Sequence, residues 1–139
     1  MNNETSRSTE RQIKKILIVE DDANIAKALA IRLKSWGYEA TVAPDAILGV
    51  SSAVRIKPDL ALLDISLPAG NGFSVADRIQ EILPRDTPFI FVTASKQPGL
   101  REKARLLGAA GFFEKPYVAE QLHAAIKGAL GDPKTHWAR

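Results

Sequence analysis

Short apolar runs alternate with longer amphipathic stretches along most of this 139-residue chain, and this alternation is the feature that most constrains its fold. Apolar runs of about five residues, rich in β-branched side chains, are typical of strands buried on both faces. We expect five such strands, at residues 15–19, 38–43, 59–63, 88–92 and 110–113.

Apolar residues recur at helical spacing in the stretches that follow these strands. We expect five helices, at residues 23–36, 45–56, 73–83, 100–107 and 119–130. A glycine or a proline comes shortly after each of them, as is common where helices end. Strands that alternate with helices predict βαβ crossovers, and therefore a single α/β domain whose parallel sheet is covered by helices on both faces.

Composition excludes several classes of function. The chain has no cysteine, so disulfides, thiol nucleophiles and cysteine metal sites are absent. The net charge of +3 comes from the two ends, because residues 16–131 hold 13 basic and 13 acidic side chains. We therefore expect no nucleic-acid-binding face.

No apolar run is long enough for a membrane span, and the polar start lacks a secretory signal, so we expect a cytoplasmic protein. We expect flexible tails at residues 1–13 and 132–139 around a folded domain at 14–131.

Polar residues collect just after the predicted strands. Glu20 and Asp21 follow the first strand, Asp64 the third, Thr93 the fourth and Lys115 the fifth. The carboxyl ends of parallel strands share one edge of a sheet, which is where ligands bind in such folds. Clustered carboxylates suit Mg²⁺ or Mn²⁺, and a lysine adds a charge that can hold a carboxylate or a phosphoryl oxygen. The neighbouring Asp22 is expected to cap the first helix.

Four segments carry a resemblance to a known family: ILIVEDD at 16–22, LLDISLP at 62–68 followed by Gly72, VTA at 92–94, and FEKP at 113–116. In spacing and order they resemble the receiver domain of two-component response regulators over about residues 14–131. The resemblance implies a (βα)5 doubly wound sheet with the flavodoxin-like strand order 2-1-3-4-5.

The resemblance also implies the roles of individual residues. Asp64 matches the phosphoacceptor, and Thr93 and Lys115 match the side chains that contact the phosphoryl group. Mg²⁺ or Mn²⁺ is expected on Glu20, Asp21, Asp64 and the backbone carbonyl of Ser66. The backbone of Ile65 and Ala94 is expected to contact the phosphoryl group. Thr93 and Phe112 match the switch pair, and the Lys115–Pro116 peptide bond is expected to be cis.

The implied function is transfer of a phosphoryl group to Asp64 from the phosphohistidine of a sensor histidine kinase or a histidine phosphotransfer protein. Such a domain catalyses only its own phosphorylation and the hydrolysis of its aspartyl phosphate. Its signal is expected to reach a downstream protein or output domain through the fourth helix, the fifth strand and the fifth helix. It is expected to be a monomer or a phosphorylation-dependent dimer, without contact to nucleic acid or membrane. The fourth-helix region offers a basic surface of Lys96, Arg101, Lys103 and Arg105.

Two other functions stay open from the sequence. A degenerate receiver could bind partners without being phosphorylated. A dehalogenase-type phosphohydrolase also uses an aspartate after a strand with Mg²⁺, but it needs a second aspartate two residues later. Ser66 stands at that position, which disfavours this alternative. His123 and His136 have no ligand partner at a useful spacing and are expected to be structural or solvated.

Overall fold

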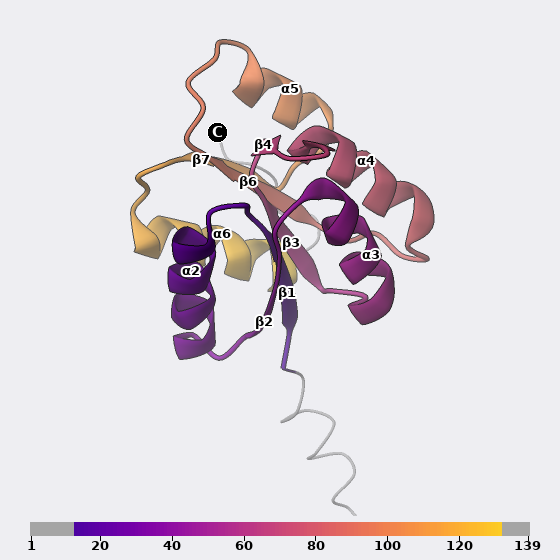
Figure 1. Ribbon diagram of the computed structural model, residues 1–139. Helices are drawn as coiled ribbons and strands as arrows, with labels where there is room; N and C mark the ends of the chain where they lie inside the picture. Colours follow the sequence, from indigo (N-terminus) through magenta and orange to yellow (C-terminus); the bar gives the residue numbers. More distant parts are fainter. Residues whose placement is uncertain (1–12, 132–139) are drawn as a thin grey trace, which may run out of the picture.

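A five-stranded parallel sheet forms the centre of the computed structural model, which describes residues 13–131 (Figure 1). Its strands lie in the order β2-β1-β3-β6-β7, which confirms the predicted order 2-1-3-4-5 of the five main strands. The tails at 1–12 and 132–139, and with them His136, lie outside the described residues. The sheet strands are β1 (Lys15–Val19), β2 (Glu39–Ala43), β3 (Leu60–Leu63), β6 (Phe89–Thr93) and β7 (Gly111–Glu114).

Five helices connect and follow the strands, as the apolar spacing predicts. They are α2 (Ala23–Ser35), α3 (Ala46–Ile56), α4 (Gly72–Ile82), α5 (Leu100–Leu106) and α6 (Ala119–Gly131). Side chains cap three of their amino termini: Asp22 accepts from the backbone N–H groups of Asn24 and Ile25, Asp45 caps α3, and Asn71 caps α4. The expected capping role of Asp22 is confirmed.

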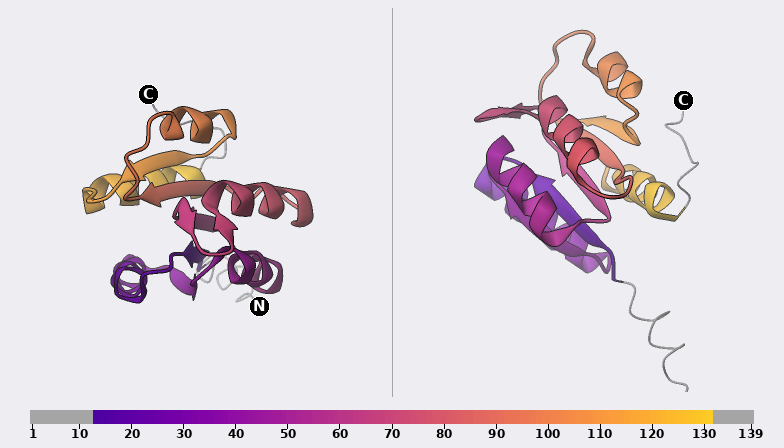
Figure 2. Two further views of the ribbon diagram at one scale, coloured as in Figure 1. Left: turned by 45° about the horizontal axis from the view of Figure 1, so that its top comes forward. Right: turned by 90° about the vertical axis from the view of Figure 1, so that its right-hand side faces the viewer.

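The helices form two layers with the sheet between them, and Figure 2 shows this from two further sides. In β1, Ile16 and Ile18 face the layer of α2 and α6, whereas Leu17 and Val19 face the layer of α3, α4 and α5. This alternation follows from the two-residue period of a strand. Because both faces are covered, the central strands are apolar throughout.

The segment between Asp64 and α4 contains two short strands that the sequence analysis does not predict. Its residues form a small antiparallel hairpin of β4 (Ser66–Leu67) and β5 (Gly70–Asn71). Two residues in and after its turn have positive φ, Ala69 at 64° and Gly70 at 143°. The strands are only two residues long, too short to show a hydrophobic period, so sequence periodicity does not reveal them.

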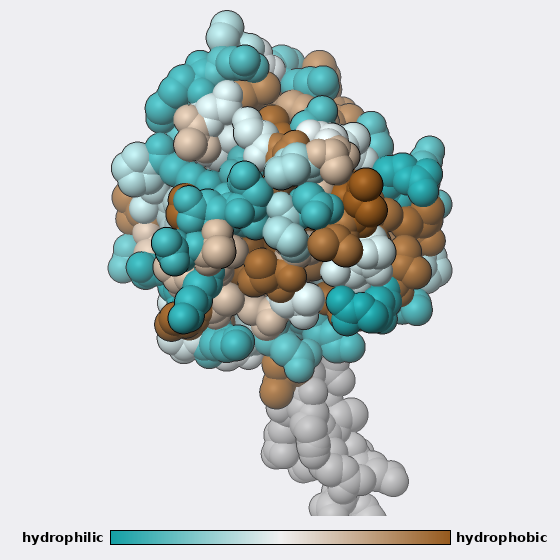
Figure 3. Space-filling view, in the orientation of Figure 1, coloured by the Kyte–Doolittle hydropathy of each residue, from teal (hydrophilic) through white to brown (hydrophobic). Residues whose placement is uncertain are grey.

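The outer side of α3 is apolar. Its residues buried against the sheet are all small (Ala46, Gly49, Ser52 and Ala53). A Cβ at Gly49 would lie 3.0 Å from the Val19 side chain, so the helix packs close to the sheet. Larger apolar residues of α3 face outward, and Ile47 is 67% exposed. Figure 3 shows apolar side chains gathered on the side of α3 and α4. Within residues 13–131 no helix is both long and apolar enough to cross a bilayer.

Candidate functional site

The carboxyl edge of the sheet brings together residues that lie far apart in the sequence. Val19 and Leu63 are register partners in the neighbouring strands β1 and β3, so the residues that follow them, Glu20 and Asp64, are adjacent. The Asp64 N–H donates to the Val19 carbonyl over 3.0 Å, which continues the sheet bonding by one residue. The predicted convergence of strand-end residues is therefore present at this edge.

Three carboxylates form a cluster at this edge. Glu20, Asp21 and Asp64 each offer an oxygen atom, and these oxygens lie within 4.8 Å of one another. Glu20 and Asp64 are buried, whereas Asp21 is exposed. Hard oxygen donors this close together fit a divalent cation such as Mg²⁺, which prefers carboxylate and water ligands. The exposed Asp21 leaves one side of the cluster open to solvent.

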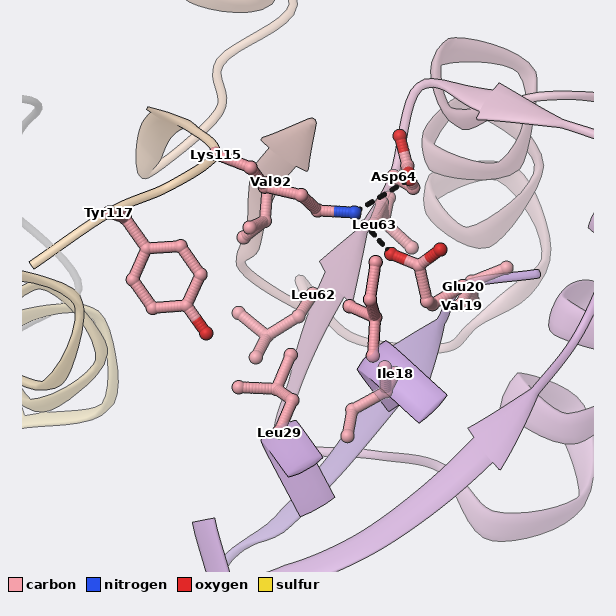
Figure 4. Close-up of a pocket in the computed structure, with 11 residues that line it drawn as sticks. Ile18, Val19, Glu20, Leu29, Leu62, Leu63, Asp64, Val92, Lys115 and Tyr117 are labelled. Atoms are coloured by element: carbon pink, nitrogen blue, oxygen red, sulfur yellow. Dashed lines mark hydrogen bonds and ion pairs between the residues drawn. The ribbon is translucent and has the colours of Figure 1, made fainter. Parts of the chain in front are cut away.

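Lys115 extends from the loop after β7 into this cluster (Figure 4). Its ammonium donates to Oδ2 of Asp64 over 3.0 Å and also pairs with Glu20. Burial lowers the pKa of Lys115, but its hydrogen bonds to Glu20 and Asp64 and the negative charges of these carboxylates outweigh this effect, so the pKa is raised overall. The lysine therefore stays protonated and supplies one positive charge to the three carboxylates. The peptide bond between Lys115 and Pro116 is cis.

The Glu20 carboxylate is held on two sides. One oxygen pairs with Lys115, and the other accepts the backbone N–H of Asp22 over 3.0 Å. Burial raises the pKa of Glu20 and the nearby Asp64 charge adds to this, although both hydrogen bonds act in the opposite direction. The net effect is a pKa of Glu20 above that of an ordinary glutamate.

The backbone after Asp64 is fixed by the start of α4. Oδ1 of Asp64 accepts the Ser66 N–H over 3.2 Å, and the Gly72 N–H donates to the Ile65 carbonyl over 2.9 Å. A Cβ on Gly72 would lie 2.2 Å from the Asp64 carbonyl oxygen, so only glycine fits at this position. Gly72 is one of the residues that carry the family resemblance, but the sequence does not reveal this contact.

Thr93 ends β6 at the same edge of the sheet and is fully buried. Its hydroxyl accepts the Ser95 N–H over 3.2 Å, and its carbonyl accepts the Lys115 N–H over 2.8 Å. The second bond ties the ends of β6 and β7 together, so Thr93 is linked through the backbone to the lysine of the site. The next residue, Ala94, is exposed at the same edge.

Phe112 lies on β7, in register with Phe91 of β6, and is 5% exposed. Its ring belongs to the apolar cluster under α3, α4 and α5. The guanidinium carbon of Arg101 lies 4.9 Å from the ring centroid. In this structure the ring is thus directed inward, with a cation above it.

The basic side chains expected to form a surface at α5 mostly contact other side chains. Lys96 pairs with Glu114 over 3.2 Å, and the guanidinium of Arg105 pairs with Glu102. Lys103 lies over the ring of Phe73, as Arg101 lies over Phe112. The positive charges of this region are therefore balanced by carboxylates or placed over aromatic rings.

The model of the response regulator receiver domain family matches residues 16–127. This chain is a receiver domain of two-component response regulators. It is 33% identical over 84% of its length to the regulator RpaA of Synechocystis sp., of which the match covers 48%. It is 35% identical over 84% of its length to the phosphate regulon regulatory protein PhoB of Pseudomonas aeruginosa, of which the match covers 52%. The chain thus spans about half the length of these relatives.

Solved structures support the same assignment. The receiver domain protein of Methanospirillum hungatei has a TM-score of 0.80 and 29% identity, over 87% of this chain and 96% of that one. The N-terminal domain of a three-domain response regulator protein from Carboxydothermus hydrogenoformans has a TM-score of 0.75 and 36% identity, over 85% of this chain and 94% of that one. These comparisons do not favour the dehalogenase-type alternative.

Two residues of this receiver domain make contacts that the sequence does not predict. Tyr117, half-buried, lines the small pocket under the Lys115 ammonium together with Leu29 and Leu62 (Figure 4). Burial raises the pKa of its hydroxyl. His123 of α6, expected to be structural or solvated, stacks on Trp36 with ring centroids 4.1 Å apart. Each contact joins two separate elements, so no local sequence signal could have shown it.

Proposed function

We propose that this receiver domain accepts a phosphoryl group on Asp64 in a reaction that depends on Mg²⁺ or Mn²⁺. The observation that carries the proposal is the contact of Asp64 with Lys115 inside the carboxylate cluster of Glu20, Asp21 and Asp64. A buried carboxylate that lies beside two further carboxylates and a lysine is suited to phosphoryl transfer, which needs positioning and charge neutralisation above all.

The cation would be held by the carboxylates of Asp21 and Asp64 and by the Ser66 carbonyl, with Glu20 acting through water. When bound, it would offset the negative charge that opposes the approach of a phosphoryl group to a carboxylate. Deprotonated carboxylates and a backbone carbonyl are hard oxygen donors, which is the set that these metals prefer.

The donor would be the phosphohistidine of a sensor histidine kinase or of a histidine phosphotransfer protein. An oxygen of Asp64 forms the new bond to phosphorus while the bond from phosphorus to the imidazole nitrogen breaks, and the imidazole leaves with that electron pair. Lys115 then pairs with a phosphoryl oxygen, and the Thr93 hydroxyl donates to another. The N–H groups of Ile65 and Ala94 complete the contacts, and water later hydrolyses the aspartyl phosphate.

The signal would leave the site through Thr93 and Phe112 to the surface of α5, β7 and α6, where a downstream protein or an output domain reads it. The Phe112 ring is already buried in this structure, and its burial is worth about 1.5–3 kcal/mol, so a signal that displaces the ring must supply a comparable free energy. A cytoplasmic location belongs to the same proposal, consistent with a chain that contains no cysteine. A monomer or a phosphorylation-dependent dimer would suit this role.

The test is incubation with acetyl phosphate and Mg²⁺, followed by intact mass measurement. We expect a mass gain of one phosphoryl group in the wild type, and no gain with EDTA or in Asp64→Asn. Asp77→Asn, which removes an exposed carboxylate on α4, is the matched control and should behave as the wild type. Mg²⁺ binding without a mass gain would favour a degenerate receiver, and absence of both would overturn the proposal.

A further inference from the structure

Helix α5 has few of the contacts that hold the other helices on the sheet. It is seven residues long, and its amino terminus follows Gly99 without a side-chain cap. Ala104 is its one buried residue, whereas α4 buries five. Leu106 is 72% exposed. Besides Ala104, the partly buried Leu100 of α5 packs against the apolar cluster, so the apolar burial that usually docks a helix is small for α5.

Two cations of α5 lie over aromatic rings of other elements. The guanidinium carbon of Arg101 is 4.9 Å from the ring centroid of Phe112 on β7. The ammonium of Lys103 is 4.5 Å from the ring centroid of Phe73 in the first turn of α4. Both distances are within the roughly 6 Å range of cation–π attraction. Both rings are buried.

The segment that leads into α5 starts at the functional site. The Thr93 hydroxyl accepts the Ser95 N–H over 3.2 Å, and the Ser95 hydroxyl accepts the Gln97 N–H over 3.4 Å. These bonds give the chain between Thr93 and Gly99 a defined shape. They link Thr93 as far as Gln97, two residues before the Gly99 that precedes α5.

We propose that Arg101 and Lys103 dock α5 through their cation–π contacts, and that Arg101 is a positioning residue for the Phe112 ring. With the guanidinium above it, the ring stays against the apolar cluster, and a displacement of α5 releases it. The docking is a property of the unphosphorylated protein. The link between docking and signalling rests on the proposed phosphorylation of Asp64.

A double-mutant cycle of Arg101→Met and Phe112→Leu tests the docking. Amide hydrogen exchange of α5 is measured in the full chain without phosphodonor. The cycle isolates the Arg101–Phe112 pair from any other contact that Arg101 makes. We expect each single variant to raise α5 exchange and the two effects to be non-additive by roughly two- to fivefold, the range for exposed cation–π pairs.

A second cycle provides the matched control. Arg105 is on the same helix, but its guanidinium pairs with Glu102 on the surface. We expect Arg105→Met and Phe112→Leu to be additive, and Arg101→Lys to keep the coupling because it keeps a cation. Additive effects of Arg101→Met and Phe112→Leu, or equal coupling for Arg105, would overturn the docking. If Phe112→Leu fails to fold, the cycle of Lys103→Met and Phe73→Met decides in the same way.

The link to signalling has a separate readout. The Arg101–Phe112 cycle is repeated after acetyl phosphate and Mg²⁺, with intact mass measured on the same samples. We expect the coupling to fall in the phosphorylated protein. Unchanged coupling in samples that carry the phosphoryl group would refute the link. A missing mass gain would instead refute the proposed function, while the result of the first cycle would stand.

Discussion

The ammonium of Lys115 donates to Oδ2 of Asp64 over 3.0 Å, although the two residues are 51 positions apart in the chain. The same ammonium pairs with Glu20, so a resident cation already neutralises part of the carboxylate cluster. A divalent cation that enters the cluster must share these two carboxylates with the lysine.

Replacement of Lys115 by methionine is expected to tighten Mg²⁺ binding. The variant removes a positive charge close to the cation site, and a unit charge at such a distance is worth about 1 kcal/mol in high dielectric, or roughly fivefold in affinity. Titration calorimetry with Mg²⁺ measures it. Lys96→Met is the control, because Lys96 pairs with Glu114 on the surface. Weaker binding in Lys115→Met would contradict this reading of the site.

Mg²⁺ affinity is expected to fall as the pH is lowered. A carboxylate must be deprotonated to hold the cation, and burial raises the pKa of Glu20 above that of an ordinary glutamate. The loss of affinity should therefore begin at a higher pH than the titration of an exposed glutamate. The dissociation constant is measured between roughly pH 5 and 8, which lies above the ordinary glutamate pKa of about 4.3. In Glu20→Gln the affinity should be lower and less dependent on pH; a constant value in the wild type would count against the prediction.

Removal of the Thr93 hydroxyl is expected to destabilise the domain. Thr93→Ala leaves the part-buried Ser95 N–H without its acceptor, which costs about 1 kcal/mol of the free energy of unfolding. Urea denaturation of the protein without phosphodonor gives this value. Thr93→Ser keeps the hydroxyl and should lose less stability than Thr93→Ala. Equal losses in both variants would show that the methyl group, and not the hydrogen bond, is responsible.

Replacement of Gly72 by alanine is expected to destabilise the domain, because the added Cβ would lie 2.2 Å from the carbonyl oxygen of Asp64. The contact is with backbone, which cannot rotate away, so we expect a loss of about 3 kcal/mol in the free energy of unfolding. Mg²⁺ affinity should fall as well, since Asp64 must shift. Gly131→Ala, where the added Cβ meets nothing within 4 Å, is the control for both measurements. A stable Gly72→Ala variant with normal Mg²⁺ affinity would disprove the close approach.

The stacked pair of Trp36 and His123 is expected to report pH through fluorescence. Burial and the charge of Lys127 lower the pKa of His123, so quenching of Trp36 by the protonated imidazole should have its midpoint below about pH 6.5. The folded state then binds this proton less tightly than the unfolded state. The contribution of His123 to stability is therefore present at neutral pH and is lost as the pH falls below the unfolded pKa.

The titration is measured in a Trp137→Phe background, because the chain has two tryptophans. His123→Gln is the control, and it should remove the transition. A midpoint above that of a free histidine would mean that the stacked ring favours the proton, contrary to the expected direction.

Residue order alone predicts the strands, the helices and the edge of the sheet at which the site lies. Apolar runs such as residues 16–19 can be buried on both faces only inside a parallel sheet, and βαβ connections put all carboxyl ends on one side. Glu20, Asp64 and Lys115 could therefore be placed at one edge from their positions after strands. The short β4–β5 hairpin was not predicted, because two residues per strand carry no periodic signal.

Which of these groups are in contact follows from the three-dimensional packing. Lys115 and Glu20 are 95 positions apart, and their ion pair depends on strand register and on the path of the loop after β7. The cation of Arg101 above Phe112 and the stacking of His123 on Trp36 likewise depend on how helices pack against other elements. Such contacts, and the pKa shifts that follow from them, arise from burial and distance in three dimensions, which residue order does not encode locally.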